Sequence, residues 1–420
     1  MGKFWREWFH DGELATITLL RWIAVGGMTG LACGLAGGVF SYALSWATQA
    51  RAEHPWLLFF LPAAGLIIVW SYQALDMEND SGTNQIIASV RSGEKPRLRL
   101  VGLIFFSTAL THLTGGSAGR EGAALQIGGS LAAAIGKLLH LQERNMNLIV
   151  LCGMSALFTA LFGTPVAATV FSLEVISVGI IQYSALFLAL FSSLTALGVT
   201  RLMGVAPLSW TLSGVPALSA LSLGRTGILA ALCALVSIVF CLVMHATASL
   251  YRRFFPNRYL RILAGAALII LLTLLEGSGD YNGAGSDIIQ AALTGEVSVP
   301  WAFVLKLTFT ALTLGAGFRG GEIVPTFFIG STFGCAVAPL LGLDPAFGAA
   351  IGLIALFCGV VNCPLASILL SVELFGGSGV MFFALACALS YLLSGKFSLY
   401  SSQKIVYSKL EPRFIDAQAR

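Results

Sequence analysis

The sequence predicts an all-α integral membrane protein made of two inverted-topology repeats, with many tilted and broken helices. Of its 420 residues, 57% are hydrophobic and only 10% are charged, against about 25% charged residues in a typical soluble protein. Apolar runs follow one another along most of the chain, and 47 glycines interrupt many of them. At about 20 residues per crossing, this length allows roughly ten to fourteen membrane segments.

Internal repetition is the second observation behind this fold. Pro165–Glu174 resembles Pro364–Glu373, with proline, alanine, serine and glutamate at matching positions. At the same spacing Arg120 falls on Arg319. If each repeat crosses the membrane an odd number of times, the two halves have opposite orientations.

The repeats predict the organisation of the chain. We expect an interfacial helix at 1–20, a first membrane repeat at 20–205, a linker at 206–225, a second membrane repeat at 226–405 and a tail at 406–420. Basic residues cluster at 91–99 and at 252–261. The excess of Lys and Arg in cytoplasmic loops predicts that both clusters face the cytoplasm.

Composition and residue spacing also exclude several classes of function. The hydrophobic fraction excludes a soluble enzyme and a disordered chain, and the net charge of +4 implies no nucleic-acid partner. The eight cysteines and five histidines show no metal-ligand spacing, so we expect no cofactor and no metal. We interpret the cysteines as small buried residues and His112 as a packed helix residue.

Four glycine-rich breaks are candidates for function: 81–84, 115–122, 315–325 and 394–402. The first three each precede an apolar run and so predict a helix amino terminus at membrane depth, where irregular backbone is tolerated only if it is buried or lines a cavity. Converging helix amino termini offer N–H groups and partial positive charge to an anion. The alternative is that the glycines only allow helices to pack closely.

Glu121 is the strongest candidate for a functional residue, because it lies between glycines in an apolar stretch. A carboxylate at membrane depth costs about 2.5–3.5 kcal/mol on insertion scales. It either forms a fixed ion pair with Arg120 or acts as a gate, occupying an anion site when charged and leaving it when protonated. We favour the gate.

Four other polar residues lie in or near apolar segments. Glu174 and Glu373 come late in their runs, which favours packing or capping. Glu322 follows two glycines, so its backbone N–H is expected at the site. Tyr400 is either an anchor at the membrane interface or a hydroxyl donor to a bound anion.

These motifs resemble those of the CLC family of chloride channels and proton-coupled anion transporters. Gly119–Gly122 matches the family's GREG motif, although Ala123 replaces the proline that follows it. Gly82–Ile86 corresponds to the GSGIP segment with Thr83 at its serine, Gly321–Pro325 to the GxFxP segment, and Tyr400 to the late tyrosine.

The resemblance implies a role for each matching residue. The Gly82–Thr83 segment, the Tyr400 hydroxyl and the N–H groups of Glu322 and Ile323 would bind a central anion. The backbone at Arg120, Glu121 and Gly122 would bind an outer anion, with Glu121 as external gate and proton acceptor. Family members are homodimers with a pore in each subunit. The nucleotide-binding CBS pair of larger members is not expected, because 20 residues follow Tyr400.

The resemblance leaves the substrate and the coupling open. Val175 stands where proton-coupled members commonly carry a second, inner glutamate, as in passive channels. Three features resemble the fluoride-exporting branch, which also lacks that glutamate. They are Thr83, the sequence Gly-Gly-Glu-Ile-Val-Pro at 320–325 and the sequence Tyr400-Ser-Ser-Gln.

The expected function is therefore transport of chloride or fluoride across a bacterial inner membrane, as anion/proton antiport gated by Glu121. The first alternative is a passive, gated chloride channel. An integral membrane enzyme is less favoured, because no nucleophile, base and orienting group are visible together. A cation-coupled transporter of organic solutes is less favoured, because the breaks are glycine-rich and suited to an anion.

Overall fold

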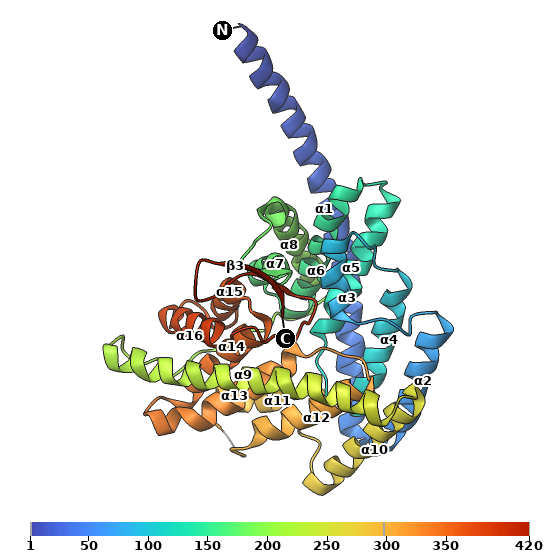
Figure 1. The fold of residues 1–420 in the computed structure, drawn as a ribbon, viewed down its shortest axis with the longest axis vertical. Helices are drawn as coiled ribbons and strands as arrows, with labels where there is room; N and C mark the ends of the chain where they lie inside the picture. Colours follow the sequence, from blue (N-terminus) through green and yellow to red (C-terminus); the bar gives the residue numbers. More distant parts are fainter. Residues whose placement is uncertain (1, 297–298, 420) are drawn as a thin grey trace.

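The computed structural model describes residues 2–296 and 299–419, and its architecture is helical (Figure 1). The first half contains α1 (Gly2–Glu53), the 3-10 helix η1 (Pro55–Phe60), α2 (Leu61–Ala74), α3 (Thr83–Ser92), α4 (Arg99–Leu113), α5 (Glu121–Leu138), α6 (Glu143–Phe162), α7 (Pro165–Glu174), β1 (Ser177–Val178), η2 (Tyr183–Ala185) and α8 (Leu186–Leu202). The second half contains α9 (Ala220–Phe254), α10 (Arg258–Glu276), α11 (Ser286–Leu293), α12 (Ala302–Ala316), α13 (Ile323–Val337), η3 (Ala338–Leu341), α14 (Pro345–Val361), α15 (Pro364–Phe375) and α16 (Val380–Leu393).

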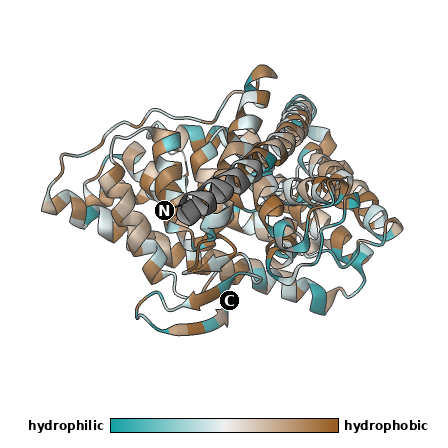
Figure 2. Ribbon diagram, turned by 90° about the horizontal axis from the view of Figure 1, so that it is seen from above, coloured by the Kyte–Doolittle hydropathy of each residue, from teal (hydrophilic) through white to brown (hydrophobic). Residues whose placement is uncertain are grey.

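The predicted mixture of long and broken helices is confirmed. Within the described residues, seven helices are long and apolar enough to cross a membrane, and six apolar helices are shorter. Figure 2 shows hydrophobic residues along the helices and hydrophilic residues mainly in their connections. Glycine or proline lies at an end of several shorter helices, such as Pro165 at the start of α7 and Gly376 after the end of α15.

The core consists of two equivalent helix pairs, α5 on α6 and α13 on α14. Glycines allow these pairs to approach closely: a Cβ atom on Gly128 would lie 2.1 Å from the Gly153 oxygen, and one on Gly334 would lie 2.1 Å from the Gly348 oxygen. The packing explanation is therefore right for these mid-helix glycines. Several glycines at the breaks are also closely packed, and there they bring helix starts together.

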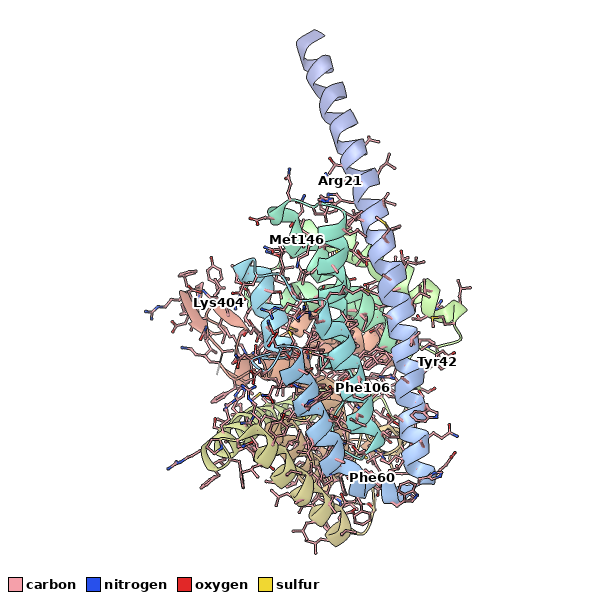
Figure 3. The ribbon with its side chains drawn as sticks, turned by 90° about the vertical axis from the view of Figure 1, so that its right-hand side faces the viewer. Arg21, Tyr42, Phe60, Phe106, Met146 and Lys404 are labelled. Carbon is pink, nitrogen blue, oxygen red and sulfur yellow. The ribbon has the colours of Figure 1, made fainter. Side chains whose placement is uncertain are left out.

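Helix direction distinguishes the two sides of the molecule. Arg97 and Arg258 both contact the turn after α2, at the Asp76 oxygen and the Glu78 carboxylate, so the two basic clusters share one side. Arg51 near the end of α1 and Trp210 in the 203–219 connection line a cavity together with the loop after α10. Because α10 begins at the basic side and ends at this cavity, the cavity opens on the opposite side. Figure 3 shows α1 along its length, with Arg21 and Tyr42 labelled on it.

The helix bounds also bear on the predicted segments. Residues 2–20 are continuous with the rest of α1, and their position at a membrane interface stays a prediction. The tail forms a small sheet that was not predicted, in which β2 (Lys404–Tyr407) pairs in parallel with β1 and antiparallel with β3 (Phe414–Gln418). All eight cysteines are buried, as expected.

Candidate functional site

The first glycine-rich break positions Gly82 and Thr83 at the start of α3. Gly82 has φ of +66°, a conformation that side-chain-bearing residues rarely adopt, and it is the N-cap of the helix. The Thr83 hydroxyl donates to the backbone oxygen of Gly122 at 3.3 Å. The start of α3 is therefore fixed against the start of α5.

The second and third breaks pair with each other. Gly119 and Gly321 exchange two backbone hydrogen bonds of 2.7 Å in an antiparallel bridge, immediately before α5 and α13 begin. A Cβ atom on Gly321 would lie 2.5 Å from the Gly122 nitrogen and 2.7 Å from the Glu121 nitrogen. Only glycine fits there, so the two helix starts meet at the centre of the molecule. This antiparallel pairing is what inverted repeats require.

The repeat equivalence at this bridge differs from the one predicted. Counted from the helix starts, the equivalent of Arg120 is Glu322 rather than Arg319, because both residues are N-caps. The reason is that α6 has 20 residues and its mate α14 has 17. The sequence spacing that aligns α7 with α15 is therefore wrong by three residues when it is applied to α5 and α13.

Glu121 is completely buried at the first position of α5. Its Oε2 atom accepts hydrogen bonds from the backbone N–H of Arg120, at 3.0 Å, and of Val324 in α13, at 3.2 Å. Its Oε1 atom has no hydrogen-bond partner among the described residues and lies 3.7 Å from Arg120 Nε. The carboxylate thus occupies the amino terminus of α13, while one of its oxygens is held only by a long ion pair.

Arg120 has a second contact besides its ion pair with Glu121. One guanidinium nitrogen donates to the backbone oxygen of Leu161 near the end of α6, at 3.2 Å. The side chain also lines a cavity of about 1090 Å³. Arg120 and Glu121 therefore form an ion pair, but a long one. This geometry is compatible with both the ion-pair and the gate interpretation of Glu121.

Glu322 and Ile323 lie at the start of α13, opposite Glu121. Glu322 Oε2 is buried without a hydrogen-bond partner among the described residues, and it lies 3.2 Å from the position that a Cβ atom on Gly122 would occupy. Its carboxyl group interacts electrostatically with that of Glu121. Ile323 is fully buried, and the N–H that contacts Glu121 belongs to the next residue, Val324.

Tyr400 lies in the turn after α16 and is only 1% exposed, which excludes the interface-anchor alternative. Its hydroxyl has no hydrogen-bond partner among the described residues and interacts electrostatically with Glu322 and Glu121. The turn is held by α3, since Asn84 Oδ1 accepts from the Ser402 N–H at 2.9 Å and Arg91 donates to the Ser402 oxygen. The aromatic hydroxyl therefore faces the same region as the two carboxyl groups.

Together, the structure brings the eight predicted site residues to one buried region. Four polar atoms there lack hydrogen-bond partners within the described chain: Glu121 Oε1, Glu322 Oε2, Tyr400 Oη and Gln126 Oε1. Buried polar atoms are normally paired. A group of unpaired atoms in one place is typical of a site for water, a proton or an ion.

Sequence analysis missed three groups at this site. Gln126 donates to the Gly122 oxygen at 3.0 Å, and its polarity within an apolar run was a usable signal. The Val324 N–H gave no signal, because any residue supplies one. Arg51 lines the large cavity together with Arg120, and no local pattern connects two residues so far apart in the chain.

Two further glutamates form a separate structure that we call the clasp. Glu373 accepts from the N–H groups of Val166 and Ala167 at the start of α7, at 3.0 and 2.8 Å. Glu174 accepts from Leu365 and Ala366 at the start of α15, at 3.3 and 2.9 Å. The predicted capping role of these two glutamates is confirmed.

Val175 follows Glu174 and is fully buried. Its backbone oxygen accepts a hydrogen bond from Gln403 Nε2 at 3.0 Å, and Gln403 also donates to the Val361 oxygen at 2.8 Å. The position of the inner glutamate in proton-coupled members is thus occupied by the aliphatic side chain of Val175. The hydrogen bond from Gln403 connects this residue to the turn that carries Tyr400.

Comparisons with known proteins agree with this geometry. Residues 64–395 match the family model described as voltage gated chloride channel. The chain is similar to a chloride/fluoride channel protein of Pseudomonas syringae pv. tomato, with 34% identity over 398 residues that cover 93% of this chain and 88% of the relative. It is also similar to an H(+)/Cl(−) exchange transporter of Vibrio cholerae, with 24% identity over 83% of this chain and 80% of the relative.

Solved structures show the same likeness. The crystal structure of a CLC-type fluoride/proton antiporter has a TM-score of 0.89 and 32% identity, covering 92% of this chain and 98% of that one. A slow cyanobacterial Cl⁻/H⁺ antiporter has a TM-score of 0.76 and 22% identity, covering 89% and 94%, and this second likeness concerns the fold alone.

Proposed function

The chain belongs to the voltage gated chloride channel family, and from this premise we propose that it exchanges a small halide for protons across a membrane. The observation that carries the proposal is the hydrogen bond from the Val324 N–H to Glu121 Oε2. A carboxylate from one repeat occupies the helix amino terminus of the other, which is a position suited to an anion.

Glu121 is the proposed gate and proton acceptor. When it is charged, it competes with a halide for the Val324 and Arg120 N–H groups. Protonation removes that charge and weakens both hydrogen bonds, because bonds to an ionised acceptor are the stronger ones. The neutral side chain then leaves, and a halide takes its place. Each turnover thus exchanges one occupant of the site for the other, which couples proton movement to anion movement.

The remaining site residues receive roles from their contacts. Thr83 and Tyr400 supply hydroxyl groups near the start of α3, and the backbone at Gly82, Gly122 and Ile323 allows close approach. Glu322 is proposed as a second proton carrier, because its unpartnered Oε2 faces the region of Thr83 and Gly122. This assignment provides an inner proton step without a glutamate at position 175.

Fluoride is the proposed substrate, with chloride as the second candidate. The fluoride/proton antiporter and the chloride/fluoride channel protein are 32% and 34% identical to this chain. Fluoride loses more hydration energy than chloride, so its site requires several hydrogen-bond donors. The hydroxyls of Thr83 and Tyr400, together with a protonated carboxyl group, meet that requirement.

A passive channel is the alternative that Val175 favours, because its side chain cannot carry a proton.

We place the protein in the bacterial inner membrane, with the basic clusters at the cytoplasmic face and the large cavity facing outward. We also propose a homodimer in which each chain has a complete ion path, since all site residues come from one chain. Mass photometry in lipid nanodiscs tests the oligomeric state.

The test of the function measures halide efflux and proton movement together in liposomes that contain the purified protein. Fluoride and chloride are loaded in separate preparations, and Glu121→Gln is compared with Glu373→Gln as a matched control in the clasp. We expect uphill proton movement driven by the fluoride gradient, lost in Glu121→Gln and retained in Glu373→Gln. Electrodiffusive efflux without proton movement identifies a channel instead, and absence of any halide flux refutes the proposal.

A further inference from the structure

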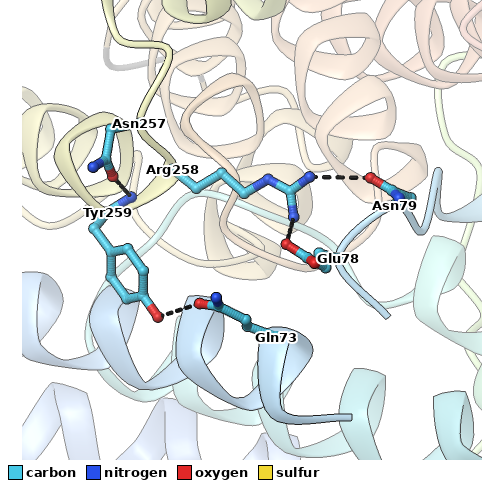
Figure 4. Close-up of polar contacts among 6 residues, drawn as sticks. All are labelled: Gln73, Glu78, Asn79, Asn257, Arg258 and Tyr259. Carbon is cyan, nitrogen blue, oxygen red and sulfur yellow. Dashed lines mark hydrogen bonds and ion pairs between the residues drawn. The ribbon is translucent and has the colours of Figure 1, made fainter. Parts of the chain in front are cut away.

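A small cavity of about 70 Å³ lies apart from the halide site, between α2, α10 and the end of α12. Its polar lining comprises Tyr72, Gln73, Glu78, Arg258, Arg261 and Arg319. Figure 4 shows part of this wall, with Arg258 directed toward Glu78 and Asn79 and with Tyr259 bonded to Gln73. The site lies on the side of the molecule that carries both basic clusters.

The cavity has more positive than negative charge. Arg258 pairs with Glu78 at 2.6 Å, and Arg319 pairs with Asp80 at 3.3 Å. Arg261 has no ion pair or side-chain hydrogen bond within the described residues, and it is in electrostatic range of Arg252, Arg258 and Arg319. A group of like charges without compensation is unfavourable, so an anion bound there would relieve the repulsion.

One buried donor also lacks an acceptor. Arg319 Nε has no hydrogen-bond partner in the described part of the chain, whereas the Tyr72 hydroxyl lies near Ser107 on α4. The Arg319 guanidinium lies over the Tyr72 ring, 4.1 Å from its centroid, which fixes both groups at the cavity wall. Guanidinium groups bind phosphate oxygens through paired N–H donors.

The surroundings indicate where the phosphate comes from. Two of the elements that form the cavity, and the segment before α10, carry large exposed hydrophobic residues close in sequence to the lining residues: Ile67 and Trp70 on α2, Phe254 and Phe255 before α10, and Leu260 on α10. These residues suit lipid chains rather than water. Basic pockets between helices on the cytoplasmic side are suited to anionic lipid head groups.

We propose that this cavity binds the phosphate group of an anionic phospholipid of the cytoplasmic leaflet. Arg261 supplies the uncompensated charge, Arg258 and Arg319 supply further donors, and the lipid chains lie along α2 and α10.

The same cavity is connected to the halide site through two residues. Arg319 directly precedes the glycine pair at 320–321, and its partner Asp80 directly precedes the 81–83 segment. A phosphate that shares Arg319 with Asp80 would therefore alter the loops at the starts of α3 and α13. This consequence for transport rests on the proposed function, whereas the binding itself does not.

Native mass spectrometry of the purified full chain tests the binding. The protein is equilibrated with phosphatidylglycerol or phosphatidylcholine, and Arg261→Gln is compared with Arg253→Gln, which removes the same charge outside the cavity. We expect about fivefold lower retention of phosphatidylglycerol in Arg261→Gln, and no loss in Arg253→Gln. Equal retention in the two variants, or equal retention of the two lipids, overturns the proposal.

A second arm separates lipid phosphate from free phosphate. Thermal unfolding is measured with and without inorganic phosphate in delipidated protein. Stabilisation by inorganic phosphate that disappears in Arg261→Gln, without any lipid preference, assigns the site to a soluble anion and overturns the lipid assignment. Because the Arg261 side chain makes no hydrogen bond or ion pair within the described residues, its replacement is not expected to prevent folding.

Transport provides the last readout. Halide efflux is compared in phosphatidylglycerol and phosphatidylcholine vesicles, where we expect the wild type and Arg253→Gln to depend on the lipid and Arg261→Gln to be insensitive. Retention of lipid without any effect on flux refutes the connection to the halide site. Absence of flux in every lipid refutes the proposed function and leaves the binding result standing.

Discussion

The clasp and the proposed halide site around Glu121 use the same type of contact for different purposes. In both, a carboxylate from one repeat accepts a hydrogen bond from an N–H group in the first turn of a helix in the other repeat. In the clasp, Glu174 and Glu373 do so reciprocally, and each uses both of its oxygens. At the halide site Glu121 uses one oxygen, and Ile323, the residue that begins the equivalent helix, has no carboxylate to return the contact.

This difference shows how a repeated fold separates structure from function. Where symmetry is kept, every helix N–H at the clasp has a permanent acceptor, so no ion can replace it. Where symmetry is broken, one acceptor is weakly held and other polar atoms stay unpaired. A movable gate requires the second arrangement, because a fully satisfied carboxylate has no reason to leave.

The strongest test of the comparison is removal of a clasp carboxylate. Glu174→Ala leaves two N–H groups of α15 without an acceptor, and Glu373→Ala does the same at α7. We expect the free energy of unfolding to fall by about 3 kcal/mol in each variant, from the usual values for helix caps and charged hydrogen bonds. Unfolding in detergent with increasing dodecyl sulfate measures it, and a loss below about 1 kcal/mol contradicts the assignment.

Glu322→Gln distinguishes a proton carrier from a structural residue. Its Oε2 has no hydrogen-bond partner to lose, so the stability of the variant should match that of the wild type. We expect proton movement in the liposome assay to slow by about tenfold or more, as when a general acid or base is removed. Unchanged proton movement would show that Glu322 acts only through its backbone.

Glu121→Ala should lower stability less than the clasp variants do. The substitution leaves the N–H groups of Arg120 and Val324 without an acceptor, but it also removes a buried carboxylate whose Oε1 atom has no hydrogen-bond partner among the described residues. We expect a loss of about 1 kcal/mol in the same unfolding assay. A loss as large as that of Glu174→Ala would mean that Glu121 is a structural cap.

A pH-dependent prediction concerns Lys409, behind the Tyr400 turn. Its ammonium group donates to the Tyr391 oxygen and the Ser394 hydroxyl, at 2.8 and 2.9 Å. Burial lowers the pKa of Lys409 to about 8, whereas a free lysine has a pKa near 10.4. Between these pH values the folded chain binds fewer protons than the unfolded chain, so stability rises with pH.

Lys409→Met removes that titration. We expect the thermal unfolding temperature of the wild type to increase relative to this variant as pH rises from 8 to about 10. The experiment is a pH series on both proteins with Lys404→Met, an exposed lysine of the same tail, as control. Parallel pH profiles for all three proteins would contradict a buried, titrating Lys409.

Much of the fold and the site could be predicted because they depend on local rules. Glycine-rich breaks before apolar runs predicted the starts of α3, α5 and α13, since glycine ends one helix and an apolar run begins the next. Repeated carboxylates late in their runs predicted a packing or capping role, but not that each caps a helix of the other repeat. The tail sheet was missed because its strands are short and depend on pairing with β1, which lies more than 200 positions away in the chain.

The sequence by itself determined that this is a membrane protein of two inverted repeats, and it predicted an anion site at the glycine-rich breaks. Hydrophobicity, glycine spacing and an isolated carboxylate are local properties, and each has few structural solutions in a bilayer. Only the tertiary structure decided that Glu121 lies against Val324 rather than Ile323, that Arg120 corresponds to Glu322, and that Arg261 has no counter-charge among the described residues. Those facts depend on the lengths and packing of helices far apart in the chain, which no local pattern encodes.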